Sequence, residues 1–300
     1  MTGKKADKEQ RKGSSEPVLV PAGPEHVEEL GRICFEAFKG IHDHHNSPRD
    51  FPTLEIAVNV IKFFVNRDDI YGVAALVDGK PAGSNFISLS DAVAGVGPIT
   101  IDPSTQARGI GRALMRDVID YAKKNGIKQV RLLQDSFNMS SLSLYSSLGF
   151  DVRVGVVLMD ASQGRNIPQG NVRPAAESDI EAMDGLCRSI YKVSRRNEIA
   201  AAMKYGFPPV LTEREGTMTG YLIPGFLGHG VARTEEDAFV LIDEASRNTP
   251  HLAKFFCPLS EARFYRESLK RGYRAVKVMN LMSIGHYDPP DEIWMPSVLY

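Results

Sequence analysis

The chain has 300 residues, of which 43% are hydrophobic and 24% are charged, and its formal net charge is −1 at pH 7. This length allows two domains, because domains usually number about 100 to 200 residues. The balanced and evenly mixed charge argues against nucleic-acid binding, which normally needs a basic stripe or patch. Three distant cysteines, Cys34, Cys187 and Cys257, indicate neither a disulfide framework nor a zinc site.

The N-terminal segment carries no sign of secretion or membrane attachment. Residues 1–16 are rich in Lys, Ser, Gly and Glu and lack the apolar centre of a signal peptide. No apolar run reaches the roughly 18 to 20 residues that a bilayer span requires. We therefore expect a disordered tail, a cytoplasmic location and no membrane partner.

A glycine-spaced segment joins a strand to a helix in the first half of the chain. An apolar strand is predicted at residues 96–103 and an amphipathic helix at residues 112–124, with Gly109 and Gly111 between them. The first helical turn has about four unpaired N–H groups and about half a positive charge. Two glycines remove the Cβ atoms that would keep a diphosphate away from those donors. The segment favours phosphate binding, and close helix packing is the alternative reason for the glycines.

A second motif follows downstream. A strand is predicted at residues 129–133, a helix from Met139 to Leu148, and a further strand from Asp151 to Met159. Gln106-x-x-Gly-x-Gly and then Asn138-x6-Tyr145-x3-Gly-Phe together resemble the two motifs of the GNAT superfamily of N-acetyltransferases. The motifs stand in the right order at a plausible distance, and the resemblance covers roughly residues 17–160.

The resemblance implies acetyl transfer from acetyl-CoA to an amine by direct attack in a ternary complex. Tyr145 would be the general acid for the departing thiolate, and no metal is implied. The alternative for Tyr145 is a core tyrosine, and for Asn138 a helix cap. The residues that the resemblance places against acetyl-CoA are Ile99, Thr100, Ile101, Gln106, Ala107, Arg108, Gly109, Ile110, Gly111, Arg112 and Asn138.

A histidine-rich run lies between two helical segments. In GNAT proteins the segment between the first two helices borders the acceptor site, so His42, His44 and His45 are candidate substrate-binding residues. The alternatives are a solvated polar loop and a metal site. We reject the metal site because no second ligand group stands at suitable spacing elsewhere. The general base that deprotonates the amine stays unassigned.

The second half of the chain repeats the first in weakened form. Residues 20–34 align with residues 173–187 without a gap, and the turn at Asp78-Gly79 has an echo in residues 210–221. Gly272-Tyr273 is the counterpart of Gly149-Phe150. The alignment puts in register Pro21 with Pro174, Ala22 with Ala175, Glu28 with Glu181, and Cys34 with Cys187.

The second copy lacks the features that define the first. Arg233-Thr234 leads directly into a helix at Glu235 with no glycine segment, and Ser268 stands where Tyr145 stands in the first copy. We predict an α/β fold of two tandem GNAT-like domains, at residues 17–165 and 166–300. Each would have a mixed, mostly antiparallel sheet flanked by helices. They would form an internal pseudo-dimer in which only the first domain binds acetyl-CoA.

Three further features of the second copy allow two interpretations each. Residues 293–300 are apolar and should be packed, either as a final strand of the second sheet or with the carboxylate of Tyr300 at the first active site. His229 and His286 either have structural hydrogen bonds or face a shared cleft.

For the acceptor we favour a small-molecule amine. The alternatives are a protein Nα or Lys group, and a non-catalytic acetyl-CoA sensor.

Overall fold

The computed structural model describes residues 16–105, 109–164 and 171–300. The chain forms two compact units. Unit 1 comprises the chain up to Gly40 with residues 49–86 and 98–118, and unit 2 comprises residues 41–48, 87–97 and 119–300. No helix in the described ranges is long and apolar enough to cross a membrane.

Unit 1 combines an antiparallel sheet with helices. Strand β1 (Val18–Pro21) pairs with β2 (Ile70–Val77), which neighbours β3 (Lys80–Ser88), and β3 also pairs with the short β5 (Thr100–Ile101). The predicted turn is confirmed: Asp78 and Gly79 both have positive φ, 51° and 76°, as a two-residue hairpin turn requires. The helical segments here are η1 (Pro24–His26), most of α2 (Val27–His44), α3 (Leu54–Val65), η2 (Pro103–Thr105) and the first part of α4 (Ile110–Lys124).

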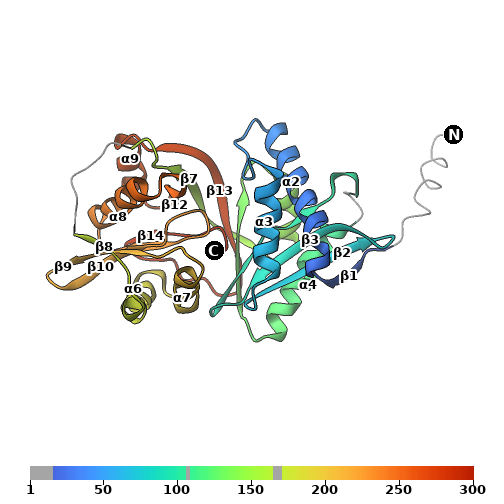
Figure 1. Ribbon diagram of the computed structural model, residues 1–300, viewed down its shortest axis with the longest axis horizontal. Helices are drawn as coiled ribbons and strands as arrows, with labels where there is room; N and C mark the ends of the chain where they lie inside the picture. The colour runs from blue at the N-terminus through green and yellow to red at the C-terminus, as the bar shows by residue number, and fades with distance from the viewer. Residues whose placement is uncertain (1–15, 106–108, 165–170) are drawn as a thin grey trace. The chain divides into compact units, whose positions relative to one another are not determined.

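The mixed sheet of unit 2 contains strands from both halves of the sequence. β4 (Val93–Val96) pairs in parallel with β6 (Gln129–Asp135), and β13 (Arg274–Ile284) lies antiparallel between β6 and β7 (Asp151–Asp160). β7 in turn lies between β13 and β12 (Lys254–Pro258), as Figure 1 shows. A strand from the second half is thus inserted between two strands of the first half, and a strand from the first half between two of the second.

The second sheet of unit 2 is antiparallel, in the order β14-β11-β10-β9-β8. Its strands are β8 (Val172–Pro174), β9 (Val210–Arg214), β10 (Thr217–Leu222), β11 (Gly230–Ala232) and β14 (Ile293–Met295). The helical segments of unit 2 include α5 (Met139–Ser147), η3 (Glu177–Asp179), α6 (Ile180–Tyr191), α7 (Arg196–Lys204), α8 (Glu235–Asn248), η4 (Pro250–Leu252) and α9 (Ala262–Lys270).

Equivalent hydrogen bonds support the alignment of the two halves. After α5 the N–H of Phe150 donates to the carbonyl of Tyr145 over 3.1 Å, and after α9 the N–H of Tyr273 donates to Ser268 over 3.1 Å. The hairpin turn recurs at Glu215-Gly216 with φ of 51° and 76°. The boundaries of the compact units differ from the boundary between the two halves of the sequence. The reason is that β7 of the first half and β13 of the second half each lie between strands of the other half. The domain boundary at residues 165/166 stays a prediction, since residues 165–170 lie outside the described ranges.

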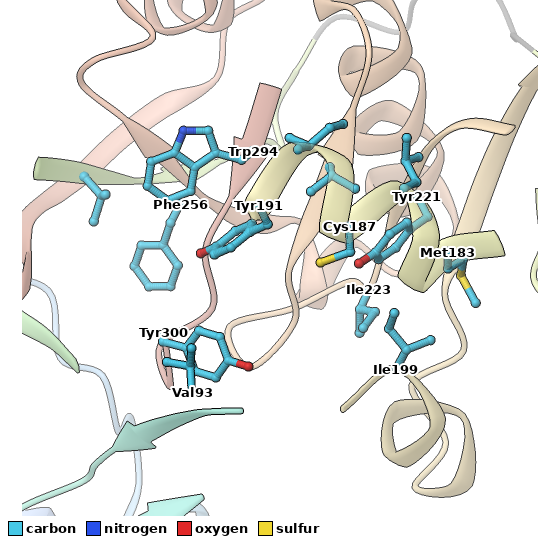
Figure 2. Packing of buried hydrophobic residues seen from close by; sticks show 14 of the residues in the cluster. Val93, Met183, Cys187, Tyr191, Ile199, Tyr221, Ile223, Phe256, Trp294 and Tyr300 are labelled. Atoms are coloured by element: carbon cyan, nitrogen blue, oxygen red, sulfur yellow. The ribbon is translucent and has the colours of Figure 1, made fainter. Parts of the chain in front are cut away.

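A core cluster of unit 2 joins the two sheets. Tyr191 on α6 packs edge-on against Trp294 on β14, with ring centroids 5.3 Å apart, and both side chains are buried (Figure 2). Val93 on β4 and Tyr300 belong to the same cluster. The residues at the end of the sequence are therefore packed, as predicted.

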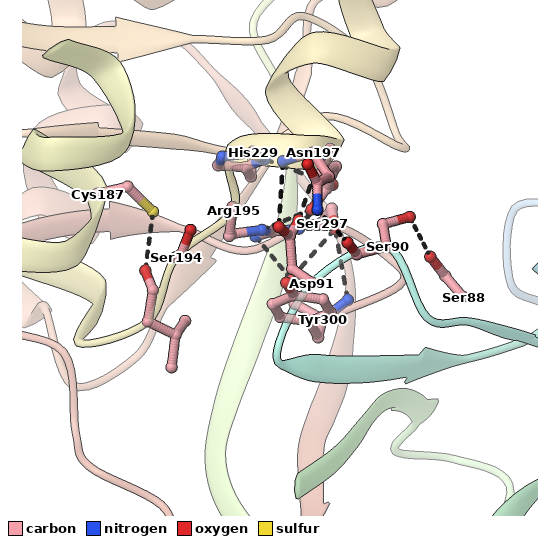
Figure 3. Close-up of polar contacts among 12 residues, drawn as sticks. Ser88, Ser90, Asp91, Cys187, Ser194, Arg195, Asn197, His229, Ser297 and Tyr300 are labelled. Carbon is pink, nitrogen blue, oxygen red and sulfur yellow. Dashed lines mark hydrogen bonds and ion pairs between the residues drawn. The ribbon is translucent and has the colours of Figure 1, made fainter. Parts of the chain in front are cut away.

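A buried polar network accompanies this cluster. Arg195 is fully buried and donates from Nη1 to the main-chain oxygen of Tyr300, over 3.0 Å, and from Nη2 to Ser297 Oγ, over 2.7 Å (Figure 3). Asp91 accepts from the N–H groups of Asn197 and Glu198, over 3.1 Å each. A carboxylate before β4 thus caps the first turn of α7, which links the two halves of the sequence.

His229 makes the stability of this network depend on pH. The ring is fully buried with Nε2 2.7 Å from the hydroxyl of Tyr221, and burial together with the charge of Arg195 lowers the pKa of His229 to about 4. The unfolded chain binds this proton near pH 6.5. The free energy of unfolding should therefore fall between pH 6.5 and 4, by about 2 to 3 kcal/mol from this group alone.

We predict that His229→Gln removes that part of the pH dependence. Urea unfolding at pH 7 and pH 4.5 measures the free energy of unfolding of both proteins. The difference in that free energy between wild type and variant should be about 2 kcal/mol smaller at the lower pH. The same difference at both pH values would contradict the assignment of a neutral His229 in the folded protein.

Gly95 on β4 has no room for a side chain. A Cβ atom there would lie 1.8 Å from the carbonyl oxygen of Leu299. We predict that Gly95→Ala lowers the free energy of unfolding by about 1 to 3 kcal/mol, because backbone must move.

Gly185→Ala is the matched control for Gly95→Ala. A Cβ on this glycine, in the interior of α6, would meet no described atom within 4 Å outside the nearby backbone of its own helix. The substitution should raise stability by up to about 1 kcal/mol, because alanine favours a helix over glycine. Equal effects of the two substitutions in thermal melts would contradict the close approach at Leu299.

Candidate functional site

The glycine segment opens α4, as the sequence predicted. α4 begins at Ile110, and Gly109 before it has a φ of 79°. Among the described residues, a Cβ at Gly109 would meet no atom within 4 Å, and the first turn of α4 carries no acidic residue. Open space beside unpaired helical N–H groups fits an anionic ligand. Gln106, Ala107 and Arg108 lie outside the described residues, and Gly111 and Arg112 lie in the first turn.

The predicted ligand-binding strand is short and paired on one side. Thr100 of β5 is the register partner of Ser84, and Ile101 that of Gly83, both on β3. Within the described ranges, β5 has β3 as its one strand partner, and Ile99 lies just before it. The other edge of β5 has no strand partner in the described ranges, and Thr100 is itself 3% exposed.

The equivalent edge in the second half is closed. β11, the counterpart of residues 99–101, pairs with β10 on one side and with β14 on the other, where Trp294 is the register partner of Val231. Trp294 is 2% exposed. The interpretation of the C-terminal residues as a final strand is confirmed for residues 293–295, and that strand occupies the edge that the first half leaves open.

The start of α8 also differs from that of α4. Only Arg233 and Thr234 separate β11 from α8, and the Thr234 hydroxyl accepts from the N–H of Asp237 over 3.2 Å. Glu235, Glu236 and Asp237 place three carboxylates in the first turn. This helix start is already capped and would repel a phosphate.

Asn138 and Tyr145 lie on one helix of unit 2. Asn138 caps α5, because its Oδ1 accepts from the N–H of Ser141 over 3.1 Å, so the cap interpretation holds for that oxygen. Tyr145 is 7% exposed and its ring lies 6.1 Å from that of Phe150. Burial, and then the negative charge of Asp135, raise the pKa of Tyr145 above its usual range. The phenol is therefore protonated at neutral pH.

A buried charge cluster lies at the end of β6. Lys277 Nζ on β13 is 2.7 Å from Asp135 Oδ1, His42 Nε2 is 3.5 Å from Asp135 Oδ2, and the same nitrogen is 3.5 Å from Lys277 Nζ. The Lys277 side chain is 3% exposed. The sequence analysis missed Asp135 and Lys277. The sequence did contain one sign of this buried pair, because Lys277 stands within an otherwise apolar strand segment, residues 276–279.

The three candidate histidines have different environments. His42 is fully buried beside Asp135, so it does not face solvent in this structure. His44 and His45 are exposed, with ring centroids 4.8 Å apart, and His45 also lies 4.9 Å from the ring of Phe137. Only His44 and His45 are accessible to an acceptor without rearrangement.

The remaining candidates have structural partners. His229 is bonded to Tyr221, as above, and the exposed His286 lies 2.8 Å from Asp288. The main-chain oxygen of Tyr300 accepts from Arg195, which accounts for the packing of this residue.

Comparisons with known proteins agree with this geometry. The Acetyltransferase (GNAT) family profile matches residues 33–150. The chain is 30% identical over 132 residues to an uncharacterized N-acetyltransferase of Methanocaldococcus jannaschii, covering 42% of this chain and 56% of that protein. The match thus spans little more than half of that relative.

Two solved structures resemble nearly the whole chain. A putative acetyltransferase from Pyrococcus horikoshii has a TM-score of 0.76 at 16% identity, with 95% of each chain covered. A tandem GNAT protein from the clavulanic acid biosynthesis pathway has a TM-score of 0.56 at 14% identity, covering 91% of this chain and all of that one. These similarities concern the fold, and they confirm the predicted α/β class with two GNAT-like sheets.

Proposed function

We propose that the chain is an N-acetyltransferase that moves an acetyl group from acetyl-CoA to an amine. The observation that carries this proposal is the contrast between the two halves. The start of α4 at Gly109 is open among the described residues and carries no acidic residue, whereas its counterpart at Glu235 is capped and acidic. One copy has kept the features suited to a diphosphate, and the GNAT match covers that copy.

The first half supplies the proposed cofactor contacts. The N–H groups from Gly109 to Arg112 would bind the pyrophosphate, with Gln106, Ala107 and Arg108 preceding them. The free edge of β5, with Ile99, would hold the pantetheine arm as an added strand. Acetyl-CoA supplies an activated thioester, so the reaction needs no metal.

Tyr145 would donate the proton in the transfer. The amine nitrogen bonds to the acetyl carbon, the carbon–sulfur bond breaks, and the thiolate takes the phenolic proton. The proton lost by the amine passes to water, and the phenolate recovers one from solvent. A raised pKa suits this role, because Tyr145 then holds its proton until a strong base forms beside it.

The proposed acceptor is a small-molecule amine. His44 and His45 are exposed polar groups in the segment between α2 and α3 that would contact it. His42 would support this segment from the interior. A protein Nα or Lys group is the alternative acceptor, and a panel of small amines beside N-terminal and lysine peptides, read by release of free thiol, distinguishes the two.

We predict that Tyr145→Phe lowers kcat by about 100-fold or more, while the Kd for acetyl-CoA changes less than about twofold. The phenylalanine keeps the ring packing against Phe150 and removes only the proton donor.

Tyr265→Phe on α9 is the control, because the second half lacks the proposed site and this residue should not affect kcat. Unchanged turnover in Tyr145→Phe would remove Tyr145 from the mechanism. Normal acetyl-CoA binding with no thiol release by wild type would favour a cofactor sensor instead.

A further inference from the structure

We propose that Arg131 on β6 is the binding residue of a buried site for a halide-sized monovalent anion, with chloride as the ion to test. Every residue that the argument uses lies in unit 2. The site is separate from acetyl transfer, so its test requires neither acetyl-CoA nor turnover.

Arg131 is a buried cation without an anionic partner in the described ranges. The residue is 1% exposed. Its Nη2 donates to Gln129 Oε1 over 3.1 Å, whereas Nε and Nη1 have no hydrogen-bond acceptor among the described residues, and no described carboxylate forms an ion pair with the guanidinium. An arginine side chain stays charged in a protein, and burial of an unpaired charge is costly. Binding of an anion removes that cost.

Arg195 shows how a carboxylate neutralises a second arginine in the same surroundings. The guanidinium carbon of Arg195 lies 5.4 Å from the ring centre of Tyr191 and 4.0 Å from that of Tyr300, and the guanidinium carbon of Arg131 lies 5.7 and 5.8 Å from the same two centres. Arg195 donates to both carboxylate oxygens of Glu198, over 2.6 and 2.7 Å. Aromatic rings attract a cation but carry no net negative charge. The two arginines thus share their rings, and Arg131 lacks the carboxylate.

Two tyrosine hydroxyls in this part of the core also lack a partner. Tyr191 and Tyr300 belong to the core cluster (Figure 2), and neither buried hydroxyl has a hydrogen-bond partner among the described residues. A tyrosine hydroxyl can accept a hydrogen bond, but neither of these accepts one from a guanidinium. Water satisfies such donors without neutralising the charge, whereas an anion does both. The arrangement therefore favours an anion.

Tyr287 covers Arg131 from an exposed segment of the chain. Its ring centre lies 5.0 Å from the guanidinium carbon of Arg131 and 5.5 Å from that of Arg153. Tyr287 is half-buried, whereas His286 and Asp288 beside it are exposed. Because Nε and Nη1 of Arg131 are buried, an anion reaches them only when the covering ring moves aside. This enclosure favours a single ion over a larger molecule.

Thermal unfolding in different sodium salts tests the site. Unfolding midpoints are measured in about 200 mM chloride, acetate or gluconate at equal ionic strength, so that a ligand of the folded state raises the midpoint. Arg131→Met removes the proposed binding group. Arg153→Met is the matched control, because Arg153 contacts the same Tyr287 ring but has a carboxylate partner, with Nη2 3.1 Å from Asp151 Oδ2.

We expect an effect of chloride that depends on Arg131. Replacing gluconate by chloride should raise the wild-type midpoint by about 3 °C or more, because the ion binds the folded state alone. Arg153→Met should show the same rise. In Arg131→Met the rise should be less than about 1 °C, since the cation that binds the ion is gone.

Three results would overturn the proposal. One is an equal rise in wild type and Arg131→Met, and another is no rise in wild type. The third is a rise in acetate without one in chloride, which would replace the halide by a carboxylate. If Arg131→Met does not fold, wild-type crystals soaked in sodium bromide decide: an anomalous peak beside the Arg131 guanidinium supports the site, and no peak there contradicts it.

Discussion

The antiparallel pairing of β7 with β13 is the constraint on which the rest of unit 2 depends. The register runs from Arg274 opposite Asp160 to Ser283 opposite Asp151, so it brings the two halves of the sequence together along a whole strand. Each of these strands also pairs with a strand of the other half, which satisfies main-chain groups that an exposed edge would leave open. The halves are therefore joined by backbone hydrogen bonds as well as by side-chain packing.

This exchange gives the second half a structural task that does not require a cofactor. β14 pairs with β11 and buries Trp294 in the core, which closes the edge equivalent to β5. The acidic first turn of α8 removes the other ligand feature. β13 also places the ammonium group of Lys277 beside the carboxylate of Asp135. The paired edge of β11 and the contacts between the two halves are thus two results of the same topology.

Local signals predicted the fold better than they predicted the surroundings of the site. The turn at Asp78-Gly79 and the helix after Gly109 follow from backbone preferences of neighbouring residues, and both were predicted. The contact between Asp135 and Lys277 joins residues 142 positions apart, through a strand insertion that no short pattern encodes. The burial of His42 was missed for the same reason, because its partners come from distant strands.

The central claim is that the first half alone retains an acetyl-CoA site, and calorimetric titration of acetyl-CoA tests it most directly. Gly109→Asn is the matched control for Gly109→Asp, because both residues tolerate a positive φ while only aspartate adds a charge beside the pyrophosphate. The account predicts one site per chain, retained in the Asn variant and weakened about tenfold or more in the Asp variant. Two sites per chain, or equal affinity in both variants, would contradict it.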